Sequence, residues 1–538
     1  ILLYRLVPAR YAALKPALEA ARAKGAKVMW ARGRGADPFI ATCILNPCKE
    51  NFARMLRYMA SKYFDIPFEV EPPLIFPELA LYRPREGLLE VDDFLSRHPP
   101  SPKGAVAVVL FHKVFFTTGN MALIDSVIEA LEREGFQVLA TYSEPLDILE
   151  ELTKRGVKPD VLVKLRVLRL SFKRPSEGVE LLKRLEVPLL CPVRVSMRTL
   201  ADWRRSAQGL DPLDLTFLVT IPEVDGAIEP LVVGGKTFEG EFHREVPLPE
   251  GVTLLARRAR KWGELRRLPN PKKRVAVIYW IVNPHAPGPG AAYLDVPLSL
   301  HKLLSAMAEE GFKVEGLPPP EEMASLLSSP PRVRIPLDKY LSWLKGVDPG
   351  LRRALFQKWG RPKRDIEIRV LILGNVVVAP QPPRVKGPNL REALHSRILP
   401  PPHEYVALYL WLANEFGADA VVHLGTHGTL EFLPGRETGL STDDWPLALI
   451  GHLPNIYVYN CVNVGEAMTA KRRSLAVIVS HNIPKFERMG LSEPLSALKR
   501  LIMLYRSSEG ELQKAYLKRI LEQAGKMGLI RKGEGKEA

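Results

Sequence analysis

The chain has 538 residues, of which 46% are hydrophobic and 25% charged. This length is too great for one compact core, so we expect three or four packed units. The mean hydropathy is −0.04, and no apolar run approaches the roughly 18 to 20 residues of a membrane-spanning helix, so we expect a soluble protein with no membrane span. The formal net charge is +16, but no zinc finger, RNP-like aromatic pattern or basic-zipper heptad accompanies it. We therefore expect no nucleic-acid partner.

The cysteines and the first residues of the chain indicate the cellular compartment in which the protein folds. Cys43, Cys48, Cys191 and Cys461 are too few and too scattered for a disulfide framework, and Cys43 and Cys48 lack a second pair that would complete a zinc site. This usage favours a reducing cytoplasm. The chain opens at Ile1 without a signal-peptide pattern, and we expect it to be part of a longer protein.

Two segments share one plan. Residues 105–111 and 275–281 are short β-branched runs, each followed by a loop and an amphipathic helix that ends before Gly135 or Gly311. After each glycine the apolar pattern predicts a return to a strand, at 136–138 and 312–314. Each is the start of a βαβ unit, so we predict an α/β, multidomain fold with doubly wound parallel-sheet units.

Further apolar runs predict strands at 161–165, 215–221, 368–378 and 418–424, and proline clusters mark the connections between them. From about Ser492 the pattern becomes helical and ends in the charged tail 531–538. We expect a partial amino-terminal α/β region at 1–98, an α/β domain at 99–268, a core α/β domain at 269–490, and a helical carboxyl-terminal segment with the tail at 491–538.

The densest group of chemically capable side chains follows the run 418–424. His423, His427 and Glu431 are spaced four apart, as on one face of a helix, but Gly425 and Gly428 favour a strand that leads into a glycine-rich loop. Two imidazoles and a carboxylate are able to hold a divalent first-row metal or to shuttle protons. We expect a site here. The residues alone also allow a zinc hydrolase, although the loop glycines disrupt the helical geometry that such sites use.

Other polar groups lie in proline-rich loops that flank the same predicted sheet. These are Gln381, the pair His395 and Arg397, and His403. Further along, the basic triplet 471–473 is either a solvated face or a clamp for carboxylates. Each of these residues is equally well explained as a turn or surface residue.

Signatures of several enzyme classes are missing. Gly235-Lys236-Thr237 resembles the end of a phosphate-binding loop, but the position that needs glycine is Pro230. The sequence also contains no nucleophile elbow and no dinucleotide-binding glycine pattern. Any step driven by ATP must therefore use another protein.

The stretch 422–436, VHLGTHGTLEFLPGR, closely resembles the signature of the large-subunit family of metal chelatases, which comprises the large subunits of aerobic cobaltochelatase and of magnesium chelatase. The family usually has Lys or Met at position 426 and Trp at 432. Further blocks in family order are 374–375 with 381–383, 395–397, 401–405, and 465–466 with 470–473. The block 222–226 resembles a family element that continues with Arg, where this chain has Ala227. The resemblance spans about 100–515.

This resemblance implies a subunit that grips a tetrapyrrole and inserts a metal. Glu431 is then expected to act as general base or metal-relay carboxylate, with His427 and His423 as metal-delivering ligands or proton acceptors. The substrate would be bound by polar side chains along the pocket, namely Gln381, His395, Arg397, His403, Arg436, Arg472 and Arg473. The resemblance further implies partner subunits of the AAA+ class, which bind and hydrolyse ATP with Mg²⁺ outside this chain.

Two substrate metals are compatible with this family. The two imidazoles and the sequence His-Leu-Gly in the signature favour Co²⁺ as the substrate metal. The macrocycle would then be hydrogenobyrinic acid a,c-diamide, in cobalamin biosynthesis. The alternatives are Mg²⁺ inserted into protoporphyrin IX, and a non-catalytic tetrapyrrole-binding module. The family's large subunit is about twice this length, so we expect activity only with the remaining half and the AAA+ partners.

Overall fold

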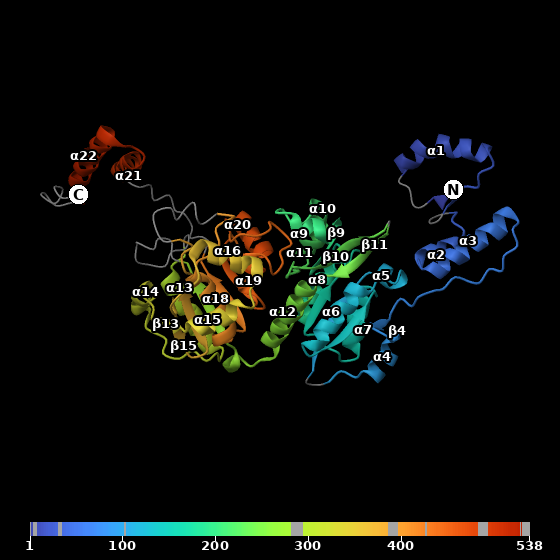
Figure 1. Ribbon diagram of the computed structural model, residues 1–538, viewed down its shortest axis with the longest axis horizontal. Coiled ribbons are helices and arrows are strands. Elements are labelled where there is room, and N and C mark those ends of the chain that lie inside the picture. Colours follow the sequence, from blue (N-terminus) through green and yellow to red (C-terminus); the bar gives the residue numbers. More distant parts are fainter. Residues whose placement is uncertain are drawn as a thin grey trace. The chain divides into compact units, whose positions relative to one another are not determined.

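The structure is a computed structural model that describes residues 2–3, 8–30, 35–101, 104–240, 242–280, 294–385, 396–425, 428–482, 493–527 and 529. The chain divides into two compact units, Ile1–Asn482 and Ile483–Ala538. The α/β fold class is confirmed, with parallel-sheet units (Figure 1). Within the described residues no helix is long and apolar enough to cross a membrane. The four-segment division stays a prediction.

The amino-terminal part consists of a short parallel pair and three helices. The elements are β1 (Leu2–Leu3), α1 (Pro8–Ala23), β2 (Met29–Trp30), α2 (Pro38–Leu45) and α3 (Lys49–Phe64). Asp37 caps α2 by accepting hydrogen bonds from the backbone N–H groups of Phe39 and Ile40, which is a common way to begin a helix.

The first six-stranded sheet has the order β4-β3-β6-β5-β7-β8. Its elements are β3 (Leu81–Arg83), β4 (Gly87–Leu89), α4 (Val91–Arg97), β5 (Ala105–Leu110), α5 (Lys113–Thr117), α6 (Ala122–Arg133), β6 (Phe136–Thr141), α7 (Pro145–Lys154), β7 (Val161–Lys164), α8 (Pro175–Leu185) and β8 (Leu189–Leu190). The pairs β6-β5, β5-β7 and β7-β8 are parallel. The predicted strands at 105–111, 136–138 and 161–165 are confirmed, with α6 covering an apolar face.

A three-stranded sheet, β11-β10-β9, follows. Its region contains β9 (Val193–Thr199), α9 (Leu200–Arg205), α10 (Pro212–Leu215), a π-helical turn (Thr216–Thr220), α11 (Ile221–Glu223), β10 (Val232–Glu239), β11 (Phe242–Pro247) and α12 (Pro249–Arg267). The predicted strand at 215–221 is wrong. Asp211 caps a helix that starts at Pro212 and continues through the apolar run, burying Leu218 and Val219 on one side.

The second six-stranded sheet has the order β15-β16-β12-β17-β18-β19 and is parallel except for the edge strand β15. Its strands are β12 (Val275–Tyr279), β15 (Leu371–Leu373), β16 (Val376–Pro380), β17 (Ala420–Leu424), β18 (Asn455–Asn460) and β19 (Ala476–His481). The predicted strands at 275–281 and 418–424 are confirmed. The run 368–378 is divided among β14 (Ile366–Arg369), β15 and β16. Gly374 adopts a positive φ of 65° and turns the chain back between β15 and β16.

Helices and a ribbon surround this sheet. They are a 3₁₀ turn (Asn270–Lys272), α13 (Val296–Glu309), α14 (Pro320–Ser328), β13 (Arg332–Ile335) paired with β14 (Ile366–Arg369), α15 (Leu337–Leu344), α16 (Pro349–Trp359), α18 (His403–Trp411) with a π-helical end (Leu412–Phe416), α19 (Trp445–Ile450) and α20 (Val464–Arg473). The predicted return to a strand at 312–314 is wrong. Phe312 and Val314 instead pack on the sheet from an irregular segment.

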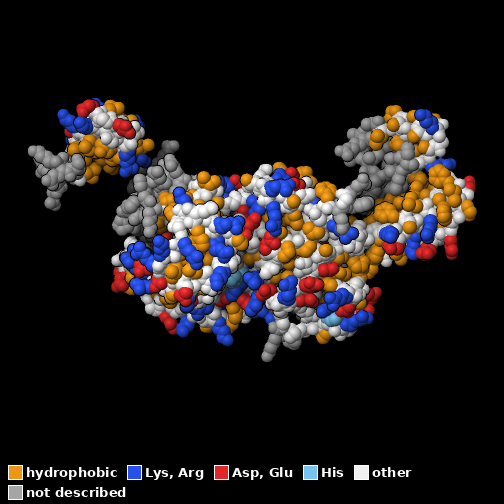
Figure 2. Space-filling view, viewed as in Figure 1, with side chains coloured by type: hydrophobic (Ala, Val, Ile, Leu, Met, Phe, Trp, Pro, Cys, Tyr) orange, Lys and Arg blue, Asp and Glu red, His pale blue; other side chains and the backbone are white. Residues whose placement is uncertain are grey.

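The second unit contains α21 (Glu493–Arg506) and α22 (Gly510–Lys526), which confirms the helical carboxyl-terminal segment. The tail 531–538 lies outside the described residues. On the face that Figure 2 shows, Lys and Arg side chains are interspersed with Asp and Glu over the sheet-bearing region. The positive charge is thus not gathered there in one basic patch.

Candidate functional site

The site lies at the carboxyl edge of the second sheet, where ligands bind in open parallel α/β sheets. A small cavity, too narrow in this structure to admit a water molecule, opens where β12, β16 and β17 end. Its lining residues are Ile278, Tyr279, Trp280, Gln381, His423, Leu424, Gly425, Gly428 and Tyr457. In the register of the sheet, Ile278, His423 and Tyr457 are direct neighbours on three adjacent strands. The predicted Gln381 and His423 are thereby brought together.

His423 is buried and both of its ring nitrogens are engaged. Nδ1 lies 2.7 Å from Oδ1 of Asn455, and Nε2 lies 3.0 Å from the hydroxyl of Tyr409. Asn455 donates through Nδ2 to the carbonyl of Ser474, so its Oδ1 must accept, and this assigns the proton to Nδ1 of His423. Burial lowers the pKa of His423 to about 4, although the bond to Asn455 opposes the shift. The ring is therefore a neutral acceptor for Tyr409.

The same chain of hydrogen bonds continues to the glycine-rich loop. Gln381 donates through Nε2 to Tyr409 at 2.8 Å. Its Oε1 accepts from the backbone N–H of Thr429 at 2.8 Å and from the Thr429 hydroxyl at 3.1 Å. That hydroxyl also lies 2.9 Å from the hydroxyl of Tyr405. With these directions each donor of the network has an acceptor, and the network therefore holds Thr429 in one position.

Glu431 lies two residues further along and is fully buried. The hydroxyl of Tyr457 donates to Glu431 Oε1 at 3.5 Å, a long hydrogen bond, and accepts a bond from the backbone N–H of Gly428. Burial, and then the charge of Glu431, raise the pKa of Tyr457 well above its usual range. The phenol therefore stays protonated and joins the start of the loop to its carboxylate.

Two buried arginines hold the loop from the other side. Arg384 donates to the carbonyl of Phe432 at 3.2 Å, and Arg473 donates to the carbonyl of Leu433 at 2.8 Å. Burial lowers the pKa of both guanidinium groups to about 10. Nε and Nη1 of Arg473 have no hydrogen-bond partner within the described residues. A buried guanidinium with free donors is suited to a carboxylate ligand.

Arg436 lies at the end of the signature and is engaged inside the protein. Its guanidinium contacts Asp443 at 2.8 Å and Asp444 at 2.7 Å, and stacks 4.3 Å from the centroid of the Trp203 ring. Burial opposes its charge, but the two carboxylates outweigh burial and raise the pKa. The side chain also reaches the carbonyl of Arg204 at 3.1 Å. Arg436 therefore links α9 to the segment that precedes α19.

The other predicted site residues are dispersed. Arg472 bonds Glu223 at 3.2 Å, and the half-exposed Arg397 pairs with Glu437 at 2.5 Å. His403 accepts from Tyr340 through Nδ1 and donates to the carbonyl of Gly360 through Nε2, both at 2.8 Å, with a pKa lowered by burial. His395 and His427 lie outside the described residues. Among the described residues no three His, Cys, Asp or Glu side chains form a metal-binding group.

Several residues of the network are not among those expected from the sequence. They are Tyr405, Tyr409, Asn455, Tyr457 and Arg384. One signal was present: in the segment Asn455-Ile-Tyr-Val-Tyr-Asn460, polar and aromatic residues alternate with aliphatic ones, which places Asn455, Tyr457 and Tyr459 on one face of a strand. Arg384 had no such signal.

Comparisons with known proteins agree on one family. The model of the family described as CobN/Magnesium Chelatase matches residues 41–538. The chain is 31% identical over 499 residues to the H subunit of magnesium chelatase from Rhodobacter capsulatus, covering 85% of this chain and 42% of that protein. It is also 31% identical to aerobic cobaltochelatase subunit CobN of Pseudomonas aeruginosa, covering 84% of this chain and 38% of the relative.

A solved structure, the catalytic subunit of cobaltochelatase from Mycobacterium tuberculosis, matches with a TM-score of 0.72 at 26% identity. The match covers 98% of this chain and 48% of that one. The chain thus spans about two fifths of the length of these curated relatives and about half of the solved structure.

Proposed function

Because this chain belongs to the CobN/magnesium chelatase family, we propose that it carries the tetrapyrrole-binding, metal-inserting core of a chelatase large subunit. The observation that carries the proposal is the fully buried carboxylate of Glu431, held by Tyr457 beside the cavity at the carboxyl edge of the second sheet. Metal insertion releases two pyrrole N–H protons, which requires a base that is fixed next to the macrocycle. Glu431 is our candidate for that base.

The two histidines take different roles in this proposal. Both nitrogens of His423 are already occupied, so we assign it a positioning role for Tyr409 and Gln381 in place of the metal-delivering role that the sequence suggested. His427, which follows Gly425 in the same loop sequence, remains the proposed imidazole that receives the metal or a second proton.

Substrate carboxylates are proposed to meet Arg473, whose buried guanidinium keeps two nitrogens without a hydrogen-bond partner in the described part of the chain. Arg397 and His395, which precede α18 in the sequence, stay proposed contacts. Arg436, Arg472 and His403 are engaged with Asp, Glu, Tyr or backbone groups, and we assign them to holding the surrounding segments in place.

We propose Co²⁺ as the substrate metal and a corrin precursor, hydrogenobyrinic acid a,c-diamide, as the macrocycle. The support is the imidazole of His427 and the sequence His-Leu-Gly at the start of the signature. The named relatives divide between cobalt and magnesium enzymes, so Mg²⁺ with protoporphyrin IX is the alternative. Parallel insertion assays with each pair distinguish the two by which metallated product forms.

The energy source is proposed to be ATP hydrolysis by AAA+ partner subunits. The support is the absence of a phosphate-binding loop from the sequence, since Pro230 replaces the required glycine. We place the assembled protein in the cytoplasm.

The test is Glu431→Gln in the full-length protein with its partners and ATP, with metallated product followed by absorbance. We expect insertion to fall by at least about a hundredfold, as for loss of a general base, while the macrocycle still binds. Glu415→Gln, a half-exposed carboxylate that pairs with Lys339, is the matched control and should insert metal at the wild-type rate. Insertion by Glu431→Gln at the wild-type rate would show that Glu431 is not the base.

A further inference from the structure

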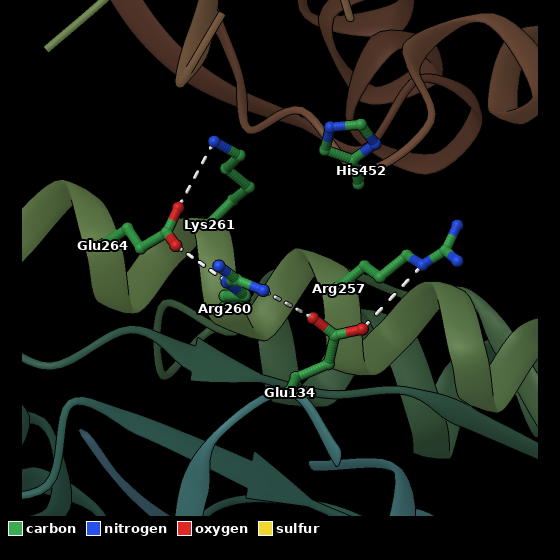
Figure 3. Close-up of a pocket in the computed structure, with 6 residues that line it drawn as sticks. All are labelled: Glu134, Arg257, Arg260, Lys261, Glu264 and His452. Carbon is green, nitrogen blue, oxygen red and sulfur yellow. Dashed lines mark hydrogen bonds and ion pairs between the residues drawn. The ribbon is translucent and has the colours of Figure 1, made fainter. Parts of the chain in front are cut away.

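A second cavity, of about 350 Å³, shares no lining residue with the cavity at the carboxyl edge of the second sheet. It is lined by Glu134, Arg257, Arg260, Lys261, Glu264 and His452 (Figure 3). Four of these residues come from α12, which packs against α6 and β10 of the region that precedes it. His452 comes from the connection between α19 and β18 in the second sheet. The cavity therefore lies between segments from the two sheet-bearing halves of the first unit.

His452 is fixed at this place by its neighbours. Arg258, fully buried on α12, donates through Nη1 to the carbonyls of Gly451 at 2.5 Å and of Leu453 at 2.9 Å. These are the residues on either side of His452. Arg258 is itself paired with the buried carboxylate of Glu229. The backbone on either side of His452 is thus bonded to α12, which keeps His452 at the wall of the cavity.

The ion pairs within the cavity occupy Arg260 and Lys261 but not the outer nitrogens of Arg257 or the ring of His452. Arg260 is bound by Glu264 at 2.8 Å and Glu134 at 3.3 Å, and Lys261 is bound by Asp419 at 2.7 Å. The only ion pair of Arg257 within the described residues is to Glu134, at 3.9 Å. Figure 3 shows the outer nitrogens of Arg257 directed away from Glu134.

His452 makes no hydrogen bond within the part of the chain that the structure describes. It lines the same cavity as Arg257 and Lys261, and in Figure 3 it lies between their side chains. The charged groups around it are Lys261, Arg258 and Arg257, opposed by Glu264. Burial, and then these cations, lower the pKa of His452 to about 4. The half-buried imidazole of His452 and the guanidinium of Arg257 both have nitrogens without a hydrogen-bond partner in the described residues. An anion in the cavity would accept hydrogen bonds from both groups.

We propose that this cavity binds a dianionic tetrahedral oxyanion, the chemistry of a phosphate group, through the guanidinium of Arg257 and the imidazole of His452. Two negative charges match the fork of the arginine and favour proton uptake by the ring, which then donates to the anion. Lys261 adds positive potential from the same helix. Because the ligand contacts α12 and the 451–453 segment together, its binding holds these two segments to one another.

The test uses sulfate as the probe, because sulfate carries two charges at every working pH and takes up no proton itself. Calorimetric titration at pH 6 in buffers of different ionisation enthalpy gives both affinity and proton uptake. We expect one site per chain and a measurable uptake of proton, up to one per site, by His452. Arg257→Gln should weaken binding by at least about tenfold, and His452→Gln should bind sulfate without proton uptake.

Arg205→Gln, an exposed arginine on α9, is the matched control and should bind as the wild type does. Inorganic phosphate, which at pH 6 is mostly the monoanion, should bind more weakly than sulfate, and acetate should bind at least tenfold more weakly than sulfate. The proposal is overturned if sulfate does not bind, if Arg257→Gln binds as tightly as wild type, or if acetate matches sulfate. Because these titrations contain no tetrapyrrole, partner or ATP, they stand apart from the test of the chelatase function.

Discussion

Replacing Arg258 by methionine tests how much the contacts of Arg258 stabilise the packing of α12 against the second sheet. Arg258 and Glu229 are both fully buried and bonded through two guanidinium nitrogens, and Trp262 donates to Glu229 at 2.7 Å. Arg258→Met leaves Glu229 buried with Trp262 and without its countercharge. Removing one partner of a buried ion pair costs about 3 to 5 kcal/mol.

Two further losses follow from the same substitution. The carbonyls of Gly451 and Leu453 lose their donor, and each buried acceptor left without one costs about 1 to 3 kcal/mol unless water replaces it. The bond to Gly451 is only partly buried, so water replaces that donor, and the ion pair with one unpaired acceptor gives a total of about 4 to 8 kcal/mol. The double substitution Arg258→Met with Glu229→Met should cost less than Arg258→Met alone, because no unpaired charge remains.

Native-state hydrogen exchange of α12 and of residues 451–453 measures this cost locally, without requiring two-state unfolding of the whole chain. Arg257→Met, the exposed neighbour on the same helix, should change the local free energy by no more than about 0.5 kcal/mol. Our reasoning is refuted if Arg258→Met costs less than about 1 kcal/mol, or if the double variant costs as much as the two single variants added together.

Further predictions concern the site and its pH dependence. Gly428→Ala should abolish insertion while the protein stays folded, because the added Cβ would meet the hydroxyl of Tyr457; activity and circular dichroism together check this, and wild-type insertion would contradict it. Tyr457→Phe should lower kcat and shift the pH–rate profile with little change in KM, since the phenol donates to Glu431; an unshifted profile would argue against the contact. The pKa of His423 is about 4 against 6.5 when unfolded, so the unfolded chain binds the extra proton, and stability should be complete above pH 6.5 and fall from there towards pH 4. His423→Gln should flatten that part of the curve of unfolding free energy against pH, and an unchanged slope would contradict the assignment.

Local patterns in the sequence determined much of the fold. The glycine at position 135 ends α6 and returns the chain to β6, as predicted, because a positive φ at a helix end needs no distant partner. The runs 161–165 and 418–424 are strands because they are apolar enough to be buried on both faces of a parallel sheet. The pattern failed at 215–221, where Asp211 and Pro212 begin a helix and the apolar residues are buried from one side.

The glycines after the run 418–424 also predicted that the chain leaves the sheet there, and β17 ends at Leu424 at the carboxyl edge. The signature from Val422 to Arg436 and the blocks around it indicated the family, which the comparisons bear out. The roles of the individual side chains within that site are still proposals.

Only the tertiary structure decided which of those polar groups are available. Arg436 reaches the carbonyl of Arg204 across 232 residues of chain, and Arg258 reaches Leu453 across 195. Asn455, 32 residues beyond His423, determines which nitrogen of that ring carries the proton. The type of a side chain determines what it is able to bind, but its partner, burial and pKa depend on segments that meet only in the folded chain. These contacts distinguish Arg436, which is paired with two carboxylates, from Arg473, which has two nitrogens without a hydrogen-bond partner in the described residues.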